Sequence, residues 1–536
     1  MPEGLSFGKD TGMPPESDPL AERFWFSAEG RRLAGTLFPP FLLRCRWFAG
    51  KARGLEEVWV ADAFRLGPRE AGLRLLLLQV RFAAGETALF SLPIRMASEA
   101  SCPGLAEGDR IGPLSPSSPQ SLWEATADPL FARALLDLLA EGKELLGPQG
   151  ILRGTRGPLL AELAAAKELP KDSRLLGREQ SNSSLLFGNR LFFKLYRKIE
   201  GGPNPDVEVH ERLSGIIGFP HVPRYGGRLD YEPQSGPSIL LGLLTEAVPH
   251  RSDTWTLALA AVSGWMRQAG EALHQSDAPQ EELFQPDWGL LGRRTAEFHL
   301  AMAQPTEDPA FRPEPLAQEE VPLFCDEALG LLRRSFGMPH GPPEAPLGLE
   351  EERLAKLFAR IEERLRGILR LPTGLMKIRI HGDYHLGQVL ATEDDFVLID
   401  FEGEPERSLA ERRRKTLALR DVAGMVRSFH YAALAPIFLQ GNAREGRLGR
   451  LAAAESWRRR ATRFFLEGYF TTAGQAPFLP AARAERSSLL DFFVLEKAVY
   501  EVGYERNNRP AWVEIPLRGI EELLESSRES EENRDL

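Results

Sequence analysis

Residues able to transfer a phosphoryl group cluster in the stretch 378–405, which reads IRIHGDYHLGQVLATEDDFVLIDFEGEP. A polar loop contains His381, Asp383 and Gln388, and an apolar Phe-Val-Leu-Ile run then leads into Asp400. Phosphoryl transfer from ATP needs a carboxylate that orients or deprotonates the attacking hydroxyl, and separate oxygen ligands that hold Mg²⁺ on the phosphates. A loop carboxylate followed by a carboxylate at a strand end supplies both kinds of group.

Each part of this stretch also has a purely structural explanation. His-Gly-Asp is common in turns where glycine takes a positive φ and aspartate caps a neighbour. An apolar strand that ends in aspartate is equally ordinary. Loop, turn, apolar strand and carboxylate in this order and spacing are much rarer than any one part, so the combination favours a functional site.

The stretch resembles the catalytic and metal-binding loops of the aminoglycoside-phosphotransferase-like kinases, distant relatives of protein kinases with the signature HxDxxxxN, a strand and IDxx. Here Gln388 stands at the asparagine position and Glu402 replaces the expected glycine. HGDxHxGQ followed by DFEGEP resembles the maltokinase branch in particular. The resemblance implies that Asp383 is the catalytic carboxylate, that Gln388 and Asp400 bind Mg²⁺ beside ATP, and that His381 supports the loop near the substrate.

Composition sets the general class of protein. A chain of 536 residues with 43% hydrophobic and 26% charged residues is typical of a globular protein of two or three domains. The net charge of −10 argues against a nucleic-acid or anionic-membrane partner. The N-terminus has no apolar core for a secretion signal, and the longest apolar run is far too short to cross a bilayer. We therefore expect a cytoplasmic location.

The order of β-like and helical patterns predicts an α+β, bilobal, kinase-like fold. Strand patterns dominate before about residue 248 and long helical patterns follow. We expect a flexible tail at 1–22, a β-rich N-terminal cap at 23–105, an intermediate N-lobe subdomain at 106–248 and a helical C-lobe at 249–536. In the cap, the segment Arg46–Lys51 resembles a maltokinase motif, and its aromatic pair is expected to pack the cap core.

A second chemical stretch predicts the nucleotide site. The polar residues from Gln180 onward, with Ser183 and Ser184, are expected to form a phosphate-contacting loop, and Gly188-Asn189 predicts a hairpin turn. Lys194 lies in an apolar strand, where an ammonium needs a partner, and Lys198 is the surface alternative. The carboxylate partners available to Lys194 are Asp206 and Glu208, of which the resemblance favours Glu208. The apolar run that ends at Glu246 would become the adenine-binding hinge.

The C-terminal part predicts a sugar site. Lys497, Tyr500 and Tyr504 recur at spacings of three and four, so one helix face carries an ammonium and two phenols; an ordinary packed helix is the alternative. The resemblance implies that these residues bind maltose for phosphorylation to maltose 1-phosphate in α-glucan synthesis, beside a trehalose-to-maltose isomerase (trehalose synthase). It also brings Arg420, Asp421 and Arg518 to the substrate. The alternatives are a glucosamine kinase of the same superfamily, because an acidic chain suits a cationic sugar, and a non-catalytic pseudokinase.

Overall fold

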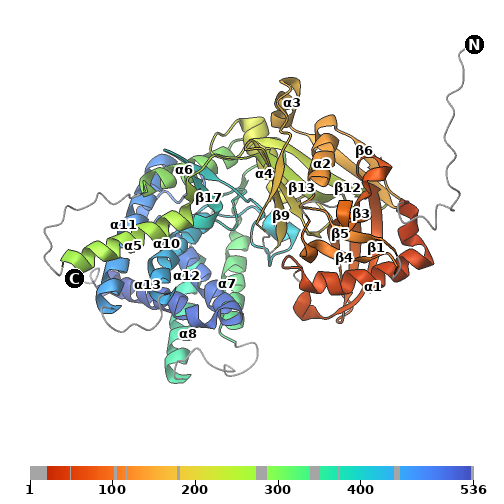
Figure 1. Ribbon diagram of the computed structural model, residues 1–536. Coiled ribbons are helices and arrows are strands. Elements are labelled where there is room, and N and C mark those ends of the chain that lie inside the picture. Colours follow the sequence, from red (N-terminus) through yellow and green to blue (C-terminus); the bar gives the residue numbers. More distant parts are fainter. Residues whose placement is uncertain are drawn as a thin grey trace, which may run out of the picture. The chain divides into compact units, whose positions relative to one another are not determined.

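The chain divides into two compact units in the computed structural model (Figure 1): Met1–Ile216 with Pro223–Ala247, and Ile217–Val222 with Val248–Leu536. Each unit is treated by itself. Residues 1–20, which hold most of the expected tail, lie outside the described part of the chain. The structure describes residues 21–48, 50–101, 105–115, 118–177, 181–272, 286–337, 351–370, 374–439 and 447–532.

The first unit begins with the cap sheet. Its strands lie in the order β1-β2-β3-β5-β4, and β11 pairs with β3. Helix α1 (Ala28–Arg44) packs against β1 and helps to bury the apolar cap core. The expected cap boundary at residue 105 falls inside this sheet, because β5 pairs with β3. The bounds are β1 Leu55–Arg65, β2 Leu73–Phe82, β3 Thr87–Ser98, β4 Arg110–Pro113, β5 Gln120–Glu124 and β11 Lys198–Ile199.

The second sheet of this unit has the order β6-β7-β12-β13-β10-β9-β8 and is antiparallel at every pairing. The helix expected from Pro129 to Leu146 is shorter: α2 ends at Glu141 because Gly142 takes φ of 62°, and the next residues form β6. The bounds are β6 Glu144–Leu146, β7 Gly150–Arg156, β8 Ser173–Leu176, β9 Asn182–Phe187, β10 Leu191–Tyr196, β12 Tyr225–Pro233, β13 Ile239–Glu246, α2 Pro129–Glu141, α3 Pro158–Ala165 and α4 Pro205–His210.

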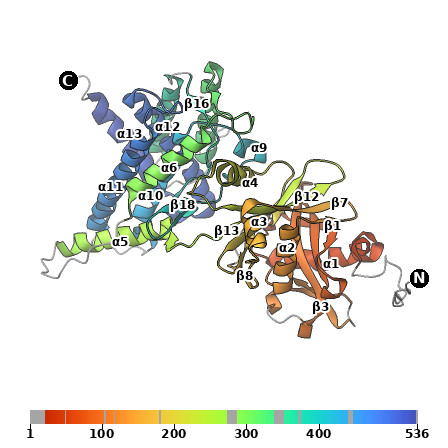
Figure 2. The ribbon, with the colours of Figure 1, turned by 90° about the horizontal axis from the view of Figure 1, so that it is seen from above.

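The second unit is built mainly from long helices (Figure 2), with two small sheets, β14-β17-β18 and β15-β16. Helix α10 packs against α5, α11 and α12. The bounds are α5 Thr254–Ala272, α6 Trp288–Met302, α7 Val321–Ser335, α8 Glu351–Arg366, α9 Leu409–Arg412, α10 Leu419–Leu439, α11 Arg447–Ala473, α12 Arg483–Asn508, α13 Glu514–Glu532, β14 Ser252–Asp253, β15 Glu314–Pro315, β16 Met376–Lys377, β17 Val389–Ala391 and β18 Phe396–Leu398.

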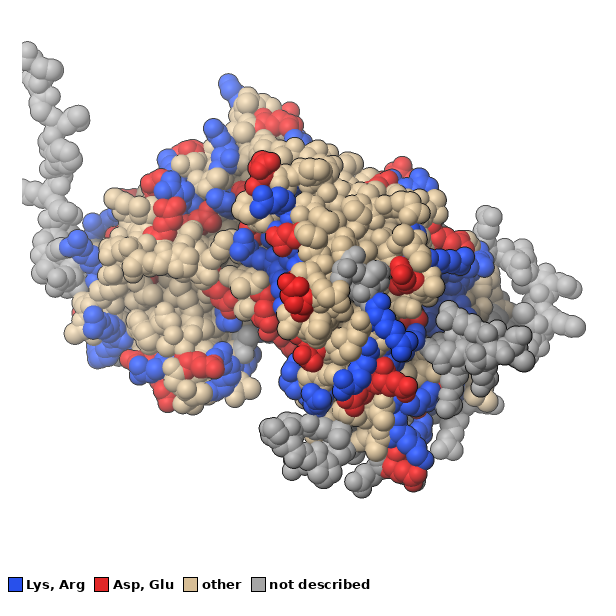
Figure 3. Space-filling view, turned by 180° about the vertical axis from the view of Figure 1, so that it is seen from behind, with Lys and Arg blue, Asp and Glu red and all other residues tan. Residues whose placement is uncertain are grey.

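Two general features of the molecule are the distribution of charge on its surface and the apolarity of its helices. On the face in Figure 3, basic and acidic side chains are interspersed. Among the described residues, no helix has the length and apolarity needed to cross a membrane.

Helices α6 and α11 approach each other closely through glycines. A Cβ added at Gly468 would overlap the carbonyl oxygen of Gly289, and one added at Gly292 would overlap that of Phe465. This contact brings together two helices that carry buried polar side chains of the candidate site.

We expect Gly468→Ala to lower the free energy of unfolding by about 1–3 kcal/mol, because the methyl group forces the two backbones apart. Thermal and urea unfolding would measure the loss. Gly449→Ala in the same helix is the matched control, since a Cβ there meets no atom of the described residues within 4 Å. It should be neutral or stabilising by up to about 1 kcal/mol. Equal effects of the two changes would contradict the role of the close contact.

Candidate active site

Asp421 fixes the backbone of the candidate catalytic loop. It lies in the first turn of α10, where the helix dipole favours a negative charge, and is 2% exposed. Its carboxylate accepts hydrogen bonds from the backbone N–H groups of His381 at 2.7 Å and Gly382 at 3.0 Å. His299 Nε2 on α6 lies 3.1 Å from the same carboxylate, and His299 Nδ1 lies 2.9 Å from the hydroxyl of Tyr469 on α11.

These contacts keep Asp421 ionised. Burial alone would raise the pKa of this carboxyl, because desolvation disfavours the charged form. The hydrogen bond and charge of His299, together with the hydrogen bond from the Gly382 N–H, outweigh burial and leave the pKa of Asp421 below its ordinary value. Although its side chain also borders the pocket described below, Asp421 is an acceptor that holds the loop.

His381 joins the loop to the residue before Asp400. Its Nε2 lies 3.0 Å from the Ile399 carbonyl oxygen, and a carbonyl can only accept, so Nε2 carries the proton. Nδ1 then accepts from the backbone N–H of Asp383 at 3.4 Å. One imidazole thus contacts the backbone of both chemical segments.

Gln388 and Asp400 are neighbours in space. Gln388 Nε2 donates to Asp400 Oδ2 at 3.0 Å, and the Ile399 N–H donates to the Gln388 main-chain oxygen at 3.0 Å. Asp400 has φ of 65°, a left-handed conformation that is uncommon outside glycine and frequent at functional sites. Gln388 and Asp400 supply an amide oxygen and a carboxylate, which are kinds of ligand that Mg²⁺ accepts. These residues fit a magnesium ion.

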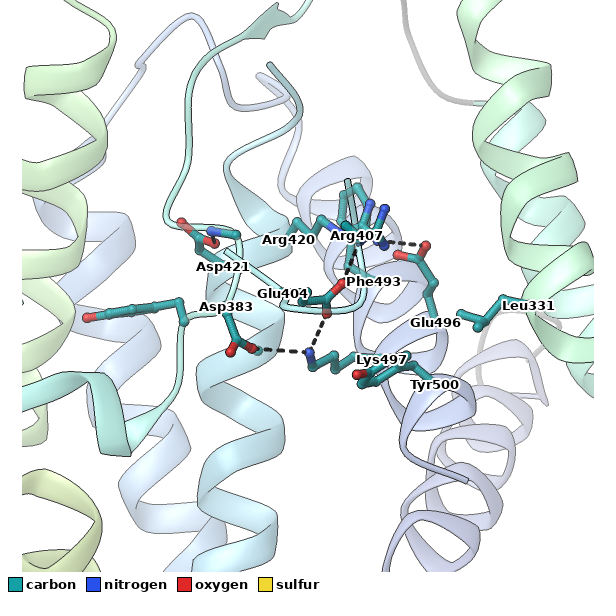
Figure 4. Close-up of a pocket in the computed structure, with 13 residues that line it drawn as sticks. Leu331, Asp383, Glu404, Arg407, Arg420, Asp421, Phe493, Glu496, Lys497 and Tyr500 are labelled. Atoms are coloured by element: carbon teal, nitrogen blue, oxygen red, sulfur yellow. Dashed lines mark hydrogen bonds and ion pairs between the residues drawn. The ribbon is translucent and has the colours of Figure 1, made fainter. Parts of the chain in front are cut away.

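Asp383 borders a small pocket of the second unit, with a volume of about 50 Å³. In Figure 4, the ammonium of Lys497 lies between two carboxylates: Lys497 Nζ is 2.6 Å from Glu404 Oε1 and 3.7 Å from Asp383 Oδ1. A cation therefore stands directly beside the candidate catalytic carboxylate. The pocket is lined by Leu331, Gly382, Asp383, Tyr384, Glu404, Arg407, Arg420, Asp421, Gly424, Phe493, Glu496, Lys497 and Tyr500.

The charges of Glu404 and Lys497 sustain each other. Burial would raise the pKa of Glu404, but Lys497, Arg407 and Arg420 lower it to about 2. Burial would lower the pKa of Lys497, but Glu404 and Asp383 raise it above its ordinary value. Both groups are charged at neutral pH, so the ammonium beside Asp383 is a fixed feature of the pocket.

The sequence-based prediction did not include three charged residues of the pocket, which are Glu404, Arg407 and Glu496. Arg407 Nε donates to Glu404 Oε2 at 2.6 Å, and Arg420 Nη2 donates to Glu496 Oε1 at 3.0 Å. Glu404 lies in the DFEGEP motif and Glu496 directly precedes Lys497, so proximity to known motifs was the available signal. Arg407 carries no comparable signal in the sequence.

The predicted sugar-binding residues separate into two groups. Lys497 and Tyr500 line the pocket, and Lys497 Nζ lies 4.7 Å from the Tyr500 ring centroid. Tyr504 stacks on Tyr500 with ring centroids 6.3 Å apart, is 39% exposed and does not line the pocket. Arg518 does not line it either: it lies on α13, and its charge acts on the buried His430.

The predicted nucleotide lysine lies in the first unit with a carboxylate partner. Lys194 Nζ is 3.4 Å from Asp206 Oδ2, and the Tyr196 hydroxyl donates to the same oxygen at 2.8 Å. Asp206 is 1% exposed in the first turn of α4. The pairing that the resemblance favoured for Glu208 is thus made by Asp206, the alternative that spacing also allowed.

The last residues of the expected phosphate-contacting loop form a strand instead of a loop. Ser183 and Ser184 lie in β9, paired with β10, and are 4% and 1% exposed. The Ser183 hydroxyl accepts from Arg197 Nε at 2.9 Å. Residues 178–180 of this segment lie outside the described part of the chain. The apolar run that ends at Glu246 is the strand β13, and the Glu246 backbone N–H donates to the Arg224 carbonyl oxygen at 2.9 Å; its role as a hinge stays a prediction.

Comparisons with known proteins agree with this architecture. Residues 41–128 match the family model of the maltokinase N-terminal cap domain. A glucosamine kinase of Streptacidiphilus jiangxiensis is 26% identical over 354 residues, which cover 65% of this chain and 72% of that protein. A glucosamine kinase of Mycolicibacterium smegmatis is 25% identical over 368 residues, covering 68% of this chain and 82% of that protein.

Solved structures show the same fold. A glucosamine kinase matches with a TM-score of 0.62 and 21% identity over 92% of this chain and 99% of the other. A glucosamine kinase in complex with glucosamine, ADP and inorganic phosphate matches with a TM-score of 0.60 and 20% identity, again over 92% and 99%. The expected α+β, kinase-like fold with an N-terminal cap is confirmed.

Glu404 predicts acid sensitivity of the second unit. Its folded pKa of about 2 lies below the ordinary value of 4.5, so its contribution to stability is present above about pH 4.5 and is lost as the pH falls towards 2. The loss is at most about 3 kcal/mol. Urea unfolding between pH 5 and pH 2.5 should show a shallower decline for Glu404→Gln than for the wild type.

Glu352→Gln is the control for this measurement, because the Glu352 side chain is 79% exposed on α8. Its stability should follow the wild-type curve. Parallel curves for Glu404→Gln and the wild type would show that the buried carboxylate is not stabilised by its cationic neighbours.

Proposed function

We propose that this chain, which joins a maltokinase-type cap to a kinase-like fold, phosphorylates a sugar hydroxyl with ATP. The observation that carries the proposal is the pocket in which Lys497 contacts both Asp383 and Glu404. The loop that carries Asp383 continues to Gln388, which contacts Asp400. A hydroxyl placed beside Asp383 has a proton acceptor within the pocket and a neighbouring ammonium that can orient a second oxygen of the substrate.

Each group has an assigned role. Asp383 orients the attacking hydroxyl and takes its proton, while Lys497 positions the sugar. Gln388 and Asp400 would hold Mg²⁺, which when bound neutralises charge on the phosphates. In the first unit, Lys194 binds ATP phosphates and the strand ending at Glu246 binds adenine through its backbone. Ser183 is engaged by Arg197, so it is not assigned a phosphate contact.

We infer maltose as the sugar, phosphorylated at its anomeric hydroxyl to maltose 1-phosphate. The DFEGEP motif supports this substrate, as does the match of residues 41–128 to the maltokinase cap domain. The proposal includes a cytoplasmic setting with ATP, a role in α-glucan synthesis and a trehalose-to-maltose isomerase as the enzyme that supplies the substrate.

Glucosamine is the second candidate, supported by the activity named for the curated relatives. The charge of Lys497 is a weak barrier to a cationic sugar, because Glu404 at 2.6 Å and Asp383 at 3.7 Å offset it. A pseudokinase is disfavoured because Lys194, Asp383, Gln388 and Asp400 are all present.

We expect Asp383→Asn to lower kcat by about 10²- to 10⁴-fold, because the amide cannot accept the hydroxyl proton. Nucleotide binding, measured by calorimetry with ATP and Mg²⁺, should persist. Asp400→Asn should also reduce turnover severely, with the fold intact by circular dichroism. Asp394→Asn, at an exposed turn, is the control. Turnover close to the wild-type rate in both active-site variants would overturn the assignment.

The sugar can be identified by comparing kcat/KM for maltose, glucose and glucosamine. We expect maltose to give the highest value. Tyr500→Ala should reduce kcat/KM for maltose by about tenfold, the size of one lost aromatic contact of roughly 1.4 kcal/mol. Tyr504→Ala removes the outer ring of the stack, which does not line the pocket, so it should lower kcat/KM for maltose less than Tyr500→Ala does. A higher kcat/KM for glucosamine would replace maltose while leaving the kinase assignment intact.

A further inference from the structure

Arg197 lies where the chain passes from one sheet of the first unit to the other. The preceding residues form β10, which carries Lys194 in the second sheet, and the following residues form β11, which pairs with β3 of the cap sheet. The backbone is tied to the cap at this point: the Ser91 N–H donates to the Arg197 carbonyl oxygen at 2.8 Å, and the Ser91 hydroxyl donates to the Tyr196 carbonyl oxygen at 2.6 Å.

The Arg197 side chain contacts both sheets and is 2% exposed. Its Nε donates to Ser183 Oγ on β9 at 2.9 Å. Its Nη2 donates to Glu124 Oε1 on β5 and to the Thr126 hydroxyl, each at 2.8 Å. A planar guanidinium can make these divergent contacts together, whereas a lysine ammonium offers no such fork.

Trp47, near the N-terminal end of the cap, is the aromatic partner of Arg197. The Arg197 guanidinium carbon lies 4.6 Å from the Trp47 ring centroid, within cation–π range. Trp47 is 6% exposed and packs near Phe48 and Phe90 in the cap core. It belongs to the Arg46–Lys51 segment, to which the proposed reaction gives no role.

The residue directly before Arg197 connects Arg197 to the predicted nucleotide lysine. Tyr196, the neighbour of Arg197, donates to Asp206 at 2.8 Å, and Asp206 is the carboxylate 3.4 Å from Lys194 Nζ. A shift of the backbone at Arg197 would therefore be passed to both sides of the Lys194–Asp206 pair.

We propose that Trp47 and Arg197 are positioning residues through which the cap holds β10, and with it Lys194, in the place that ATP requires. The inference rests on the proposed function, because it assumes that Lys194 binds ATP. It gives the cap a role in nucleotide binding.

The experiment compares Arg197→Met and Trp47→Leu with the conservative Arg197→Lys and Trp47→Phe in the full-length protein. We expect the first two to raise the KM for ATP and the Kd for ATP with Mg²⁺ by about tenfold, because a displaced Lys194 would lose part of its contact with the phosphates and a tenfold change corresponds to about 1.4 kcal/mol. The KM for the sugar should change by less than about twofold. Trp47→Phe should restore most of the ATP affinity because it keeps an aromatic face, and Arg197→Lys should restore part.

Arg95→Met is the matched control. Arg95 is also a largely buried arginine of this unit, and its Nη1 lies 2.8 Å from Asp128 Oδ2. None of the hydrogen bonds or ion pairs of Arg95 among the described residues reaches β9 or β10, so Arg95→Met should lower thermal stability without changing the KM for ATP. If Arg197→Met fails to fold because Glu124 is left as an unpaired buried charge, the double variant Arg197→Met with Glu124→Gln removes that charge and serves in its place.

The outcomes separate the two proposals. An active wild type whose Trp47 and Arg197 variants keep the wild-type KM and Kd for ATP, while losing stability, would overturn the positioning role alone. A wild type that neither binds ATP with Mg²⁺ nor phosphorylates any tested sugar would overturn the proposed function.

Discussion

The second unit depends on one buried carboxylate. Asp421 can remain charged at 2% exposure only because two loop N–H groups and His299 bind it, since a buried charge without partners is strongly destabilising. His299 is in turn held by Tyr469. The loop bearing Asp383 therefore cannot move without removing two of the hydrogen bonds that stabilise this buried charge. The same carboxylate, through His299 and Tyr469, links α6, α10 and α11.

The pocket also depends on pairing of buried charges, and it holds more of them. Four carboxylates and three cationic side chains line it, and Lys497, Arg407 and Arg420 each lie within 3.0 Å of a carboxylate oxygen. Like charges can converge there only because opposite charges alternate with them. Since the formal charges nearly cancel, net charge selects weakly among sugars, and selection must come from shape and from hydrogen bonds to hydroxyl groups.

Local patterns predicted local features. The loop around Asp383, the hairpin before Lys194 and the helix face of Lys497 and Tyr500 follow from turn residues, apolar runs and helical spacing. Features set by distant partners were missed: Ser183 belongs to a strand because β9 pairs with β8 and β10, and β5 joins the cap because it pairs with β3. Asp206, and not Glu208, is the partner of Lys194 because of where α4 begins. Asn204 is the N-cap of this helix, and its side chain accepts a hydrogen bond from the Asp206 N–H at 2.9 Å.

The first unit also explains why the cap and the strand that carries Lys194 should fold as one body. β10 and β11 are separated only by Arg197, so the chain leaves one sheet and enters the other without a flexible linker. An arginine buried at that point needs its carboxylate, hydroxyl and aromatic partners, and these come from β5, β9 and the segment after α1. Separation of the sheets would expose or unpair this charge, so the free energy that keeps Arg197 buried also fixes the strand that carries Lys194.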